Sequence, residues 1–201
     1  MANLQKELDQ IIKDAITPLI KTKGFKKQGR NFFKDLGKIG WCFNIQSSLY
    51  SHQENVNFTF NVGIFVPSAY EIYYNEPIPK FPKEYHCIVR KRISELKDVS
   101  KEAWYSYNEN VISDKLFKQL KADMEGYILP FFNIDTIDEL INFMLDGERW
   151  GPQGKAMLII ILKQNGFEQK AQTLFDEQFQ YSNEQYKEYL KGLANRIGLA
   201  Y

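Results

Sequence analysis

The sequence predicts an α+β fold, in which an antiparallel sheet of four or five strands is covered by an N-terminal helix and followed by a C-terminal helical region. Two observations carry this prediction. Apolar and polar residues alternate with period two along 41–50 and again along 56–66, which is typical of a hairpin with one oily face. Helical periodicity occupies the chain before residue 22 and again from residue 111 onward.

The first helix is predicted from Asn3 to about Thr22, because apolar residues recur there at helical spacing. Asn3 is a suitable N-cap. Pro18 lies inside this segment and has no backbone N–H to donate, so we expect a kink there. Gly24 is expected to follow the helix at the C′ position, with Phe25 folding back on the last turn.

The central hairpin is predicted to join the two alternating strands through the polar connection 51–54. Pairing Tyr50 with Asn55 places Asn44 opposite Asn61. The oily parity, which the N-terminal helix must cover, consists of Trp41, Phe43, Ile45, Leu49, Val56, Phe58, Phe60, Val62 and Ile64. The other parity carries amides and hydroxyls in place of the lysines and glutamates usual on a solvated face: Asn44, Gln46, Ser48, Asn57, Thr59 and Asn61.

Further segments flank this hairpin. A strand at 31–35 leads into it through a short turn and puts Phe32 on the oily face. Residues 67–83 combine prolines with tyrosines and a phenylalanine, so a long proline-braced loop is expected. Strands follow at about 85–93 and about 103–107.

From Val111 onward the periodicity is helical. Helices are predicted up to Pro130, and then at 134–145, 152–165, 168–179 and 183–197. The chain is therefore divided into an α+β sheet domain, 1–110, and a helical region, 111–201, which is expected to pack on the first as one compact unit. Residues 1–101 carry a formal charge of +6 and residues 102–201 a charge of −5, and such a split often follows a change of architecture.

Composition argues against several classes of protein. The longest apolar run has seven residues, far fewer than the roughly 20 that span a bilayer, and the start of the chain lacks a signal-peptide core. A cytoplasmic protein without a membrane partner is therefore expected. Two cysteines imply no disulfide framework, and adjacent His86 and Cys87 would point to opposite faces of a strand, so no metal is expected. Gly147–Ala156 has neither the spacing nor the Ser/Thr of a phosphate loop, and no cofactor or catalytic set is predicted.

The polar parity of the hairpin is the candidate functional surface. If the strand at 85–93 continues this face, two arginines join its amides; guanidinium groups suit carboxylate or phosphate, and amides suit peptide or base edges. The structural alternative is that the face is covered and its amides bond to each other across the strands. With Tyr73 of the proline-braced segment and Arg30 of the basic segment, the candidate binding residues are Arg30, Asn44, Gln46, Asn61, Arg90, Arg92 and Tyr73.

The basic segment 21–38 carries seven positive residues interleaved with phenylalanines, a pattern also found on nucleic-acid surfaces. The formal charge of the whole chain is only +1, and the phenylalanines serve better as core. Nucleic-acid binding is accordingly the third of three interpretations.

Several stretches resemble a bacterial family of domains of unknown function. The likeness begins with Gly24-Phe25-Lys26-Lys27-Gln28-Gly29-Arg30-Asn31-Phe32 and continues through 43–48, 58–64, 90–96 and Trp104, over roughly the first 130 residues. It implies a bacterial α+β domain with no established activity, and it supplies no catalytic residues.

These observations favour a non-enzymatic module that binds a protein or peptide partner, with an immunity-like role as one form. The alternative is an enzyme that binds a small molecule or anion on the polar face. A deep pocket that joins Arg90 and Arg92 to Asn44, Gln46 and residues 70–74 would favour the enzyme. A flat or filled face would favour the module.

Overall fold

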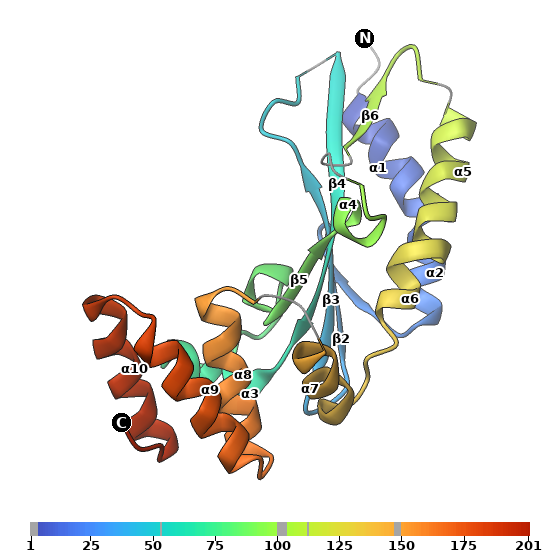
Figure 1. Ribbon diagram of the computed structural model, residues 1–201. Helices are drawn as coiled ribbons and strands as arrows, with labels where there is room; N and C mark the ends of the chain where they lie inside the picture. Colours follow the sequence, from blue (N-terminus) through green and yellow to red (C-terminus); the bar gives the residue numbers. More distant parts are fainter. Residues whose placement is uncertain (1–3, 53, 100–103, 112, 147–149) are drawn as a thin grey trace.

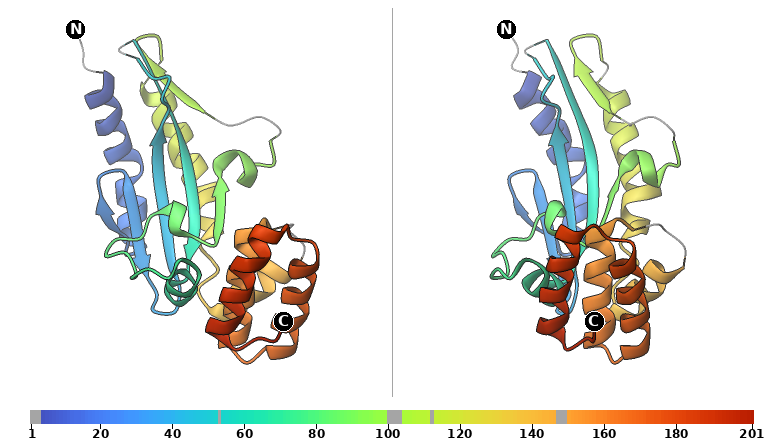
Figure 2. Two further views of the ribbon diagram at one scale, coloured as in Figure 1. Left: turned by 90° about the vertical axis from the view of Figure 1, so that its left-hand side faces the viewer. Right: turned by 60° about the vertical axis from the view of Figure 1, so that its left-hand side comes forward.

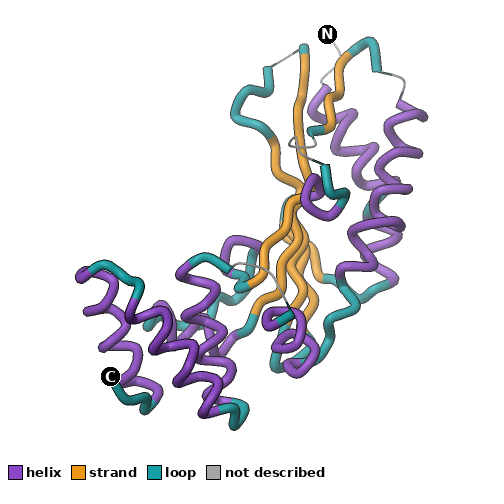
Figure 3. The backbone as a smooth tube through the Cα atoms, in the orientation of Figure 1, coloured by secondary structure: helices purple, strands orange, loops and turns teal. Residues whose placement is uncertain are grey.

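The computed structural model describes residues 4–52, 54–99, 104–111, 113–146 and 150–201. A twisted antiparallel sheet forms the centre of the molecule (Figure 1). Figure 3 shows the helices in two groups, one along one face of the sheet and one at the opposite side of its lower end. The α+β prediction is confirmed.

The sheet has six strands, where four or five were predicted. They are β1 (Lys26–Gln28), β2 (Asn31–Asp35), β3 (Gly40–Ser47), β4 (Asn55–Phe65), β5 (Val89–Arg92) and β6 (Tyr105–Asn108). Strands β1 to β4 are neighbours in sequence order. Strands β5 and β6 lie end to end along the outer edge of β4, where β5 pairs with 61–64 and β6 with 55–58.

The predicted register of the central hairpin is confirmed along β3, with Asn44 opposite Asn61 and Gln46 opposite Thr59. The predicted pair of Tyr50 with Asn55 is wrong, because β3 ends at Ser47 and Asn55 pairs with His52. Phe32 lies opposite Phe43, on the oily face as predicted. Leu49 was wrongly assigned to that face: it follows the end of β3 and is 98% exposed.

The helices are α1 (Leu4–Ala15), α2 (Thr17–Thr22), α3 (Pro67–Tyr74), α4 (Ile93–Leu96), α5 (Ser113–Asp123), α6 (Leu129–Phe131), α7 (Ile137–Leu145), α8 (Pro152–Gln164), α9 (Glu168–Gln180) and α10 (Glu184–Ile197). A 3-10 turn, Glu84–His86, precedes β5, and a π-helical turn, Met124–Ile128, joins α5 to α6. The helical path that was predicted to end at Pro130 therefore continues to Phe131. None of the described helices has the length and apolar content needed to cross a membrane.

The N-terminal helix is broken in two, because the chain leaves α1 after Ala15 and re-enters a helix with Pro18 in its first turn. The predicted kink is confirmed, as is Gly24, whose φ of +82° is easily adopted only by glycine. The backbone N–H of Phe25 returns to the carbonyl of Ile20, as a Schellman ending requires. The predicted N-cap, Asn3, lies outside the described residues.

The main core lies between the oily face of the sheet and helices α1, α2, α5 and α6 (Figure 1). Phe43, Phe58 and Phe60 are almost fully buried there. At its lower end Trp41 stacks on Phe132 with ring centroids 5.3 Å apart, and its indole N–H donates to the carbonyl of Ile134 at 2.7 Å. The helical region thus begins by completing the core of the sheet.

Two predictions for the segment after the hairpin are wrong. Residues 67–74 form helix α3 instead of a loop, since Pro67 sits in its first turn where no N–H is required. The strand expected at 85–93 is limited to Val89–Arg92, because the 3-10 turn takes up the preceding residues. A small second core forms against the lower half of the polar face, from Cys42, Phe65, Tyr70 and Cys87 with Phe33 beside them.

Helices α8, α9 and α10 form the second helical group (Figure 2). They reach the sheet domain through α3: Ser68 donates to Gln164 at 2.8 Å, and Gln153 donates to the Tyr74 hydroxyl at 2.8 Å. The apolar run of α8 is buried along its whole length. The division of the chain at residue 110 stays a prediction.

Candidate functional site

Four strands bring one polar residue each into a single row across the sheet. Asn31 of β2 lies opposite Asn44 of β3, Asn44 lies opposite Asn61 of β4, and Asn61 lies opposite Arg92 of β5. Gln46 and Thr59 form the next row. Strand alternation alone puts all of these side chains on the face that α1 does not cover.

The row is joined by side-chain hydrogen bonds from end to end. Arg92 Nε donates to Asn61 Oδ1 at 3.3 Å, and Asn61 Nδ2 donates to Asn44 Oδ1 at 3.2 Å and to Gln46 Oε1 at 2.9 Å. Asn44 Nδ2 in turn donates to Asn31 Oδ1 at 2.8 Å. We call these five residues the amide ladder. Sequence reasoning had foreseen such cross-strand bonds as the structural alternative.

Arg92 determines which way each amide group of the ladder is turned. A guanidinium group only donates, so Asn61 must turn its oxygen toward Arg92 and its NH₂ group toward the other amides. Asn44 and Gln46 must then present oxygen to Asn61, which leaves Asn44 Nδ2 to donate to Asn31. No amide in the ladder can be flipped without losing a bond.

The two arginines predicted for the site lie at its edge. Arg92 is half-buried and places its guanidinium 5.7 Å from the ring centre of Trp104. Arg90 leaves 54% of its side chain exposed and donates to Glu84 at 3.2 Å. Trp104, just before β6, is 36% exposed; sequence reasoning had placed it in the strand at about 103–107 and in the family resemblance but not in the site. Its position one residue before Tyr105, across from Thr59, could have placed it on the polar face.

The described helices cover the lower half of the polar face. There α3 and the 3-10 turn close the small second core, whereas no described helix lies in front of the upper half of β3 and β4 (Figure 2, left). Within the ladder Gln46 is exposed, Asn31 and Asn44 are half-buried, and Asn61 is 7% exposed. The site is an ordered polar platform with a buried centre and an accessible rim.

Two predicted binding residues lie away from this platform. Arg30, in the turn between β1 and β2, pairs with Asp9 of α1 at 2.5 Å and bonds to Ser47, on the oily side of the sheet. Tyr73 of α3 packs against Tyr189 of α10 at 5.3 Å between ring centres. The structure therefore brings together Asn44, Gln46, Asn61 and Arg92, with Arg90 beside them.

One buried charged cluster was missed by sequence reasoning. Asp123 pairs with Lys97 at 2.6 Å and accepts the hydroxyl of Tyr105 at 2.6 Å. Burial raises the pKa of Tyr105, so the hydroxyl stays protonated and donates. The signal was the position of Asp123, three residues after Leu120 on an otherwise apolar stripe. Because its members satisfy each other, we assign it a structural role that joins α4, α5 and β6.

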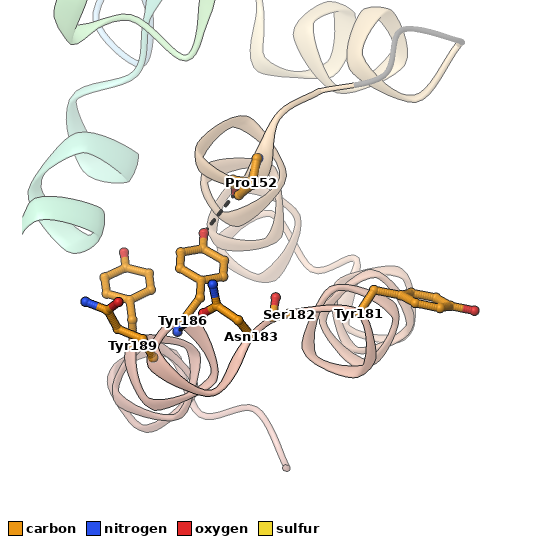
Figure 4. Close-up of a pocket in the computed structure, with 7 residues that line it drawn as sticks. Pro152, Tyr181, Ser182, Asn183, Tyr186 and Tyr189 are labelled. Carbon is orange, nitrogen blue, oxygen red and sulfur yellow. Dashed lines mark hydrogen bonds between the residues drawn. The ribbon is translucent and has the colours of Figure 1, made fainter.

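A concave surface lies where α8 meets the connection between α9 and α10 (Figure 4). This groove has a volume of about 600 Å³ and is lined by Pro152, Tyr181, Ser182, Asn183, Gln185, Tyr186 and Tyr189. The hydroxyl of Tyr186 donates to the carbonyl of Pro152 at 3.1 Å, and that of Tyr189 donates to the carbonyl of Tyr73 at 2.9 Å. Tyr181 points away from the groove and is 80% exposed. The two bonded tyrosines fasten α10 to α8 and α3.

The titratable residues near the small second core are held in neutral forms. His86 accepts the backbone N–H of Lys83 at Nδ1, and burial lowers its pKa. Burial raises the pKa of the Cys87 thiol. Among the described residues, no three His, Cys, Asp or Glu side chains gather into a group that could hold a metal ion.

Comparison with known proteins identifies one match. A family described as "Domain of unknown function (DUF4304)" matches residues 16–134, more than half of the chain. No curated protein and no solved structure matches. The matched range contains the whole amide ladder and Trp104, whereas the groove of Figure 4 lies beyond it.

Proposed function

The chain belongs to the DUF4304 family of domains of unknown function, and we propose that it is a non-enzymatic module that binds a protein or peptide partner through its polar sheet face. The observation that carries this proposal is the amide ladder. A row of buried-to-exposed amides, oriented by one arginine and open at its rim, is a rigid surface for polar recognition. Rigid polar groups lower the ordering cost of binding.

The chemistry of the face supports binding over catalysis. Amides and guanidinium groups keep one charge state over the whole neutral range, so the ladder supplies no acid–base pair. Tyr73, which the enzyme alternative would bring to the arginines, packs against α10. Arg30 of the basic segment likewise lies away from the polar face, since it pairs with Asp9 of α1.

A selection with a displayed random peptide library tests the proposal. Peptides recovered on the native protein are expected to bind Trp104→Ala and Gln46→Ala at least tenfold more weakly, a loss of about 1.4 kcal/mol per tenfold. Tyr181→Ala is the matched control, because Tyr181 is an exposed aromatic on the C-terminal helices. Equal loss in the control, or no loss in either face variant, would contradict the proposal.

The finer biological setting belongs to the same proposal. The opening motif 24–32 supports a bacterial origin. An immunity-like role would make the partner a toxin. Photo-crosslinking from position 46 in the source cells, followed by mass spectrometry, identifies that partner directly.

A further inference from the structure

We propose that the segment seated on the polar sheet face is an extended acidic peptide, which offers carboxylate and carbonyl oxygens to a surface of N–H donors. This inference rests on the proposed function and adds the chemistry of the partner. It follows from the orientation of the amide groups in the ladder, which leaves more N–H donors than oxygen acceptors available to a ligand.

Each side-chain amide oxygen of the face already accepts at least one hydrogen bond inside the protein. The side-chain oxygens of Asn31, Asn44, Asn61 and Gln46 each accept a hydrogen bond within the ladder. Farther up the same face, the side-chain oxygen of Asn57 accepts from Asn55. The oxygen of Asn55 accepts from Ser106 at 2.6 Å and from Asn108 at 3.4 Å.

The groups that remain toward a ligand are mostly donors. The NH₂ groups of Asn31, Gln46 and Asn57 make no hydrogen bond to other described residues, and Asn44 uses one of its two amide hydrogens, whereas the side-chain oxygen of each of these residues has already accepted one bond. A ligand that brings oxygen acceptors satisfies this excess of N–H groups, since a donor placed against a donor is left unsatisfied.

The charge of the face has the matching sign. Arg90 and Arg92 stand at its edge, and their guanidinium forks fit carboxylates in a bidentate way. Arg90 pairs with Glu84 at 3.2 Å but leaves 54% of its side chain exposed, so its guanidinium can also face a carboxylate of a ligand. Glu95 accepts the backbone N–H of Arg92 at 2.6 Å. An incoming acidic chain therefore meets an exposed cation at the rim and an excess of amide donors at the centre.

Two observations favour a peptide over nucleic acid. Tight phosphate-backbone binding usually draws on some six to ten Lys and Arg contacts, and this face offers two arginines. The basic segment adds little to it: Lys26, opposite Phe33, shares the polar side, whereas Lys27 and Lys34 lie over Phe32 and Trp41 on the oily side. An extended peptide with acidic residues at alternate positions presents its carboxylates on one side, at the spacing of a strand.

Fluorescence anisotropy with three labelled eight-residue peptides tests the inference: alternating Glu-Thr, Gln-Thr and Lys-Thr. We expect the Glu-Thr peptide to bind at least tenfold more tightly than the Gln-Thr peptide, with no binding of the Lys-Thr peptide. Binding should weaken at least fivefold between 0.05 M and 0.5 M salt, because exposed charges are screened.

Two substitutions place the peptide on the face. Gln46→Glu replaces a donor by an acceptor, and Arg90→Gln removes an exposed cation; each should weaken Glu-Thr binding at least tenfold. Tyr181→Glu adds the same negative charge far from the face and should change binding less than twofold. Circular dichroism melts check that every variant folds.

The outcomes separate this inference from the proposed function. Equal binding of the Gln-Thr and Glu-Thr peptides overturns the acidic partner. If library peptides without acidic residues bind and this binding depends on the polar face, the proposed binding function is supported and the acidic partner is overturned. Binding of a single-stranded oligonucleotide with the same Gln46→Glu loss, but no peptide binding, would assign the face to nucleic acid and overturn both.

Discussion

Asn61 is the central residue of the amide ladder. It accepts from Arg92 and donates to two amides while being 7% exposed. Gln46, one bond away, is at the exposed rim and accepts a single bond. From the sequence the two looked equivalent, because alternation assigns a face and says nothing about depth.

Replacing these two residues should therefore have different effects on stability. Asn61→Ala removes a hydrogen bond from the half-buried guanidinium of Arg92 and the donor of two amide oxygens, and we expect a loss of about 1–3 kcal/mol in the free energy of unfolding. Gln46→Ala should change it by about 0.5 kcal/mol or less. Urea denaturation measures both free energies of unfolding. Equal losses in the two variants would contradict the larger contribution assigned to the buried Asn61.

His86 makes the free energy of unfolding depend on pH at values higher than those at which carboxylates titrate. Its folded pKa is lowered from the ordinary value of 6.5, so the unfolded chain binds a proton more readily. The contribution of neutral His86 is full above pH 6.5 and is lost as the pH falls below that value toward the lowered folded pKa. Protonation of Nδ1 would also break its bond from Lys83.

The corresponding test compares native protein with His86→Gln at pH 7.5, 6.5 and 5.5. We expect the urea midpoint of the native protein to fall with decreasing pH and that of the variant to fall less. His52→Gln is the matched control, because it makes the same substitution at an exposed position. Identical slopes for the native protein and His86→Gln would contradict the assignment.

At the scale of elements, Gly63 shows why the 3-10 turn can lie so close to the sheet. A Cβ added there would lie 2.7 Å from Cβ and Sγ of Cys87 and 2.9 Å from the carbonyl oxygen of Val89. Gly63→Ala should cost about 1–3 kcal/mol by overpacking. In contrast, Gly192→Ala meets nothing within 4 Å inside α10 and should stabilise by about 0.4–1 kcal/mol. Thermal midpoints that shift the same way in both variants would contradict this contrast.

The elements that the sequence predicted correctly are those that are determined by residues close together in sequence. The register of β3 and β4, the break near Pro18 and the ending at Gly24 follow from local rules, and each is confirmed. Helix α3 was missed because prolines and tyrosines suggested a loop, whereas burial of Tyr70 against Phe65 selects a helix. The shortened β5 has the same cause, since packing of Cys87 against Gly63 sets where that strand begins.

At the scale of the whole molecule, α3 is the joint between the sheet and the C-terminal helices. Its residues Ser68, Tyr73 and Tyr74 bond to Gln164, Tyr189 and Gln153. We propose that these bonds make the chain one cooperative unit. Urea unfolding followed by far-UV circular dichroism, dominated by helices, should then coincide with unfolding followed by Trp41 fluorescence in a Trp104→Phe/Trp150→Phe background. Two separated transitions would show that α8–α10 unfold on their own.

The candidate site could be predicted only in part, because some of its predicted residues are held by partners far away in sequence. Strand alternation placed Asn44, Gln46 and Asn61 together, and the pairing of β5 added Arg92. Arg30 and Tyr73 were drawn from composition, and their partners, Asp9 and Tyr189, lie 21 and 116 residues away in sequence. Contacts of that range are set by how helices dock, which single-sequence patterns do not encode.

The division of one edge of β4 between two short strands has a consequence for how this family can diversify. Because β5 and β6 pair with β4 independently, the connection that begins with α4 carries the register of neither strand. An insertion or deletion in this connection would leave the pairing of β3 with β4 unchanged, although Arg92 and Trp104, at the rim of the amide ladder, stand at its two ends. Under the proposed binding role, a change in the length or composition of this connection would therefore alter the contacts with a partner without altering the strands that hold the ladder.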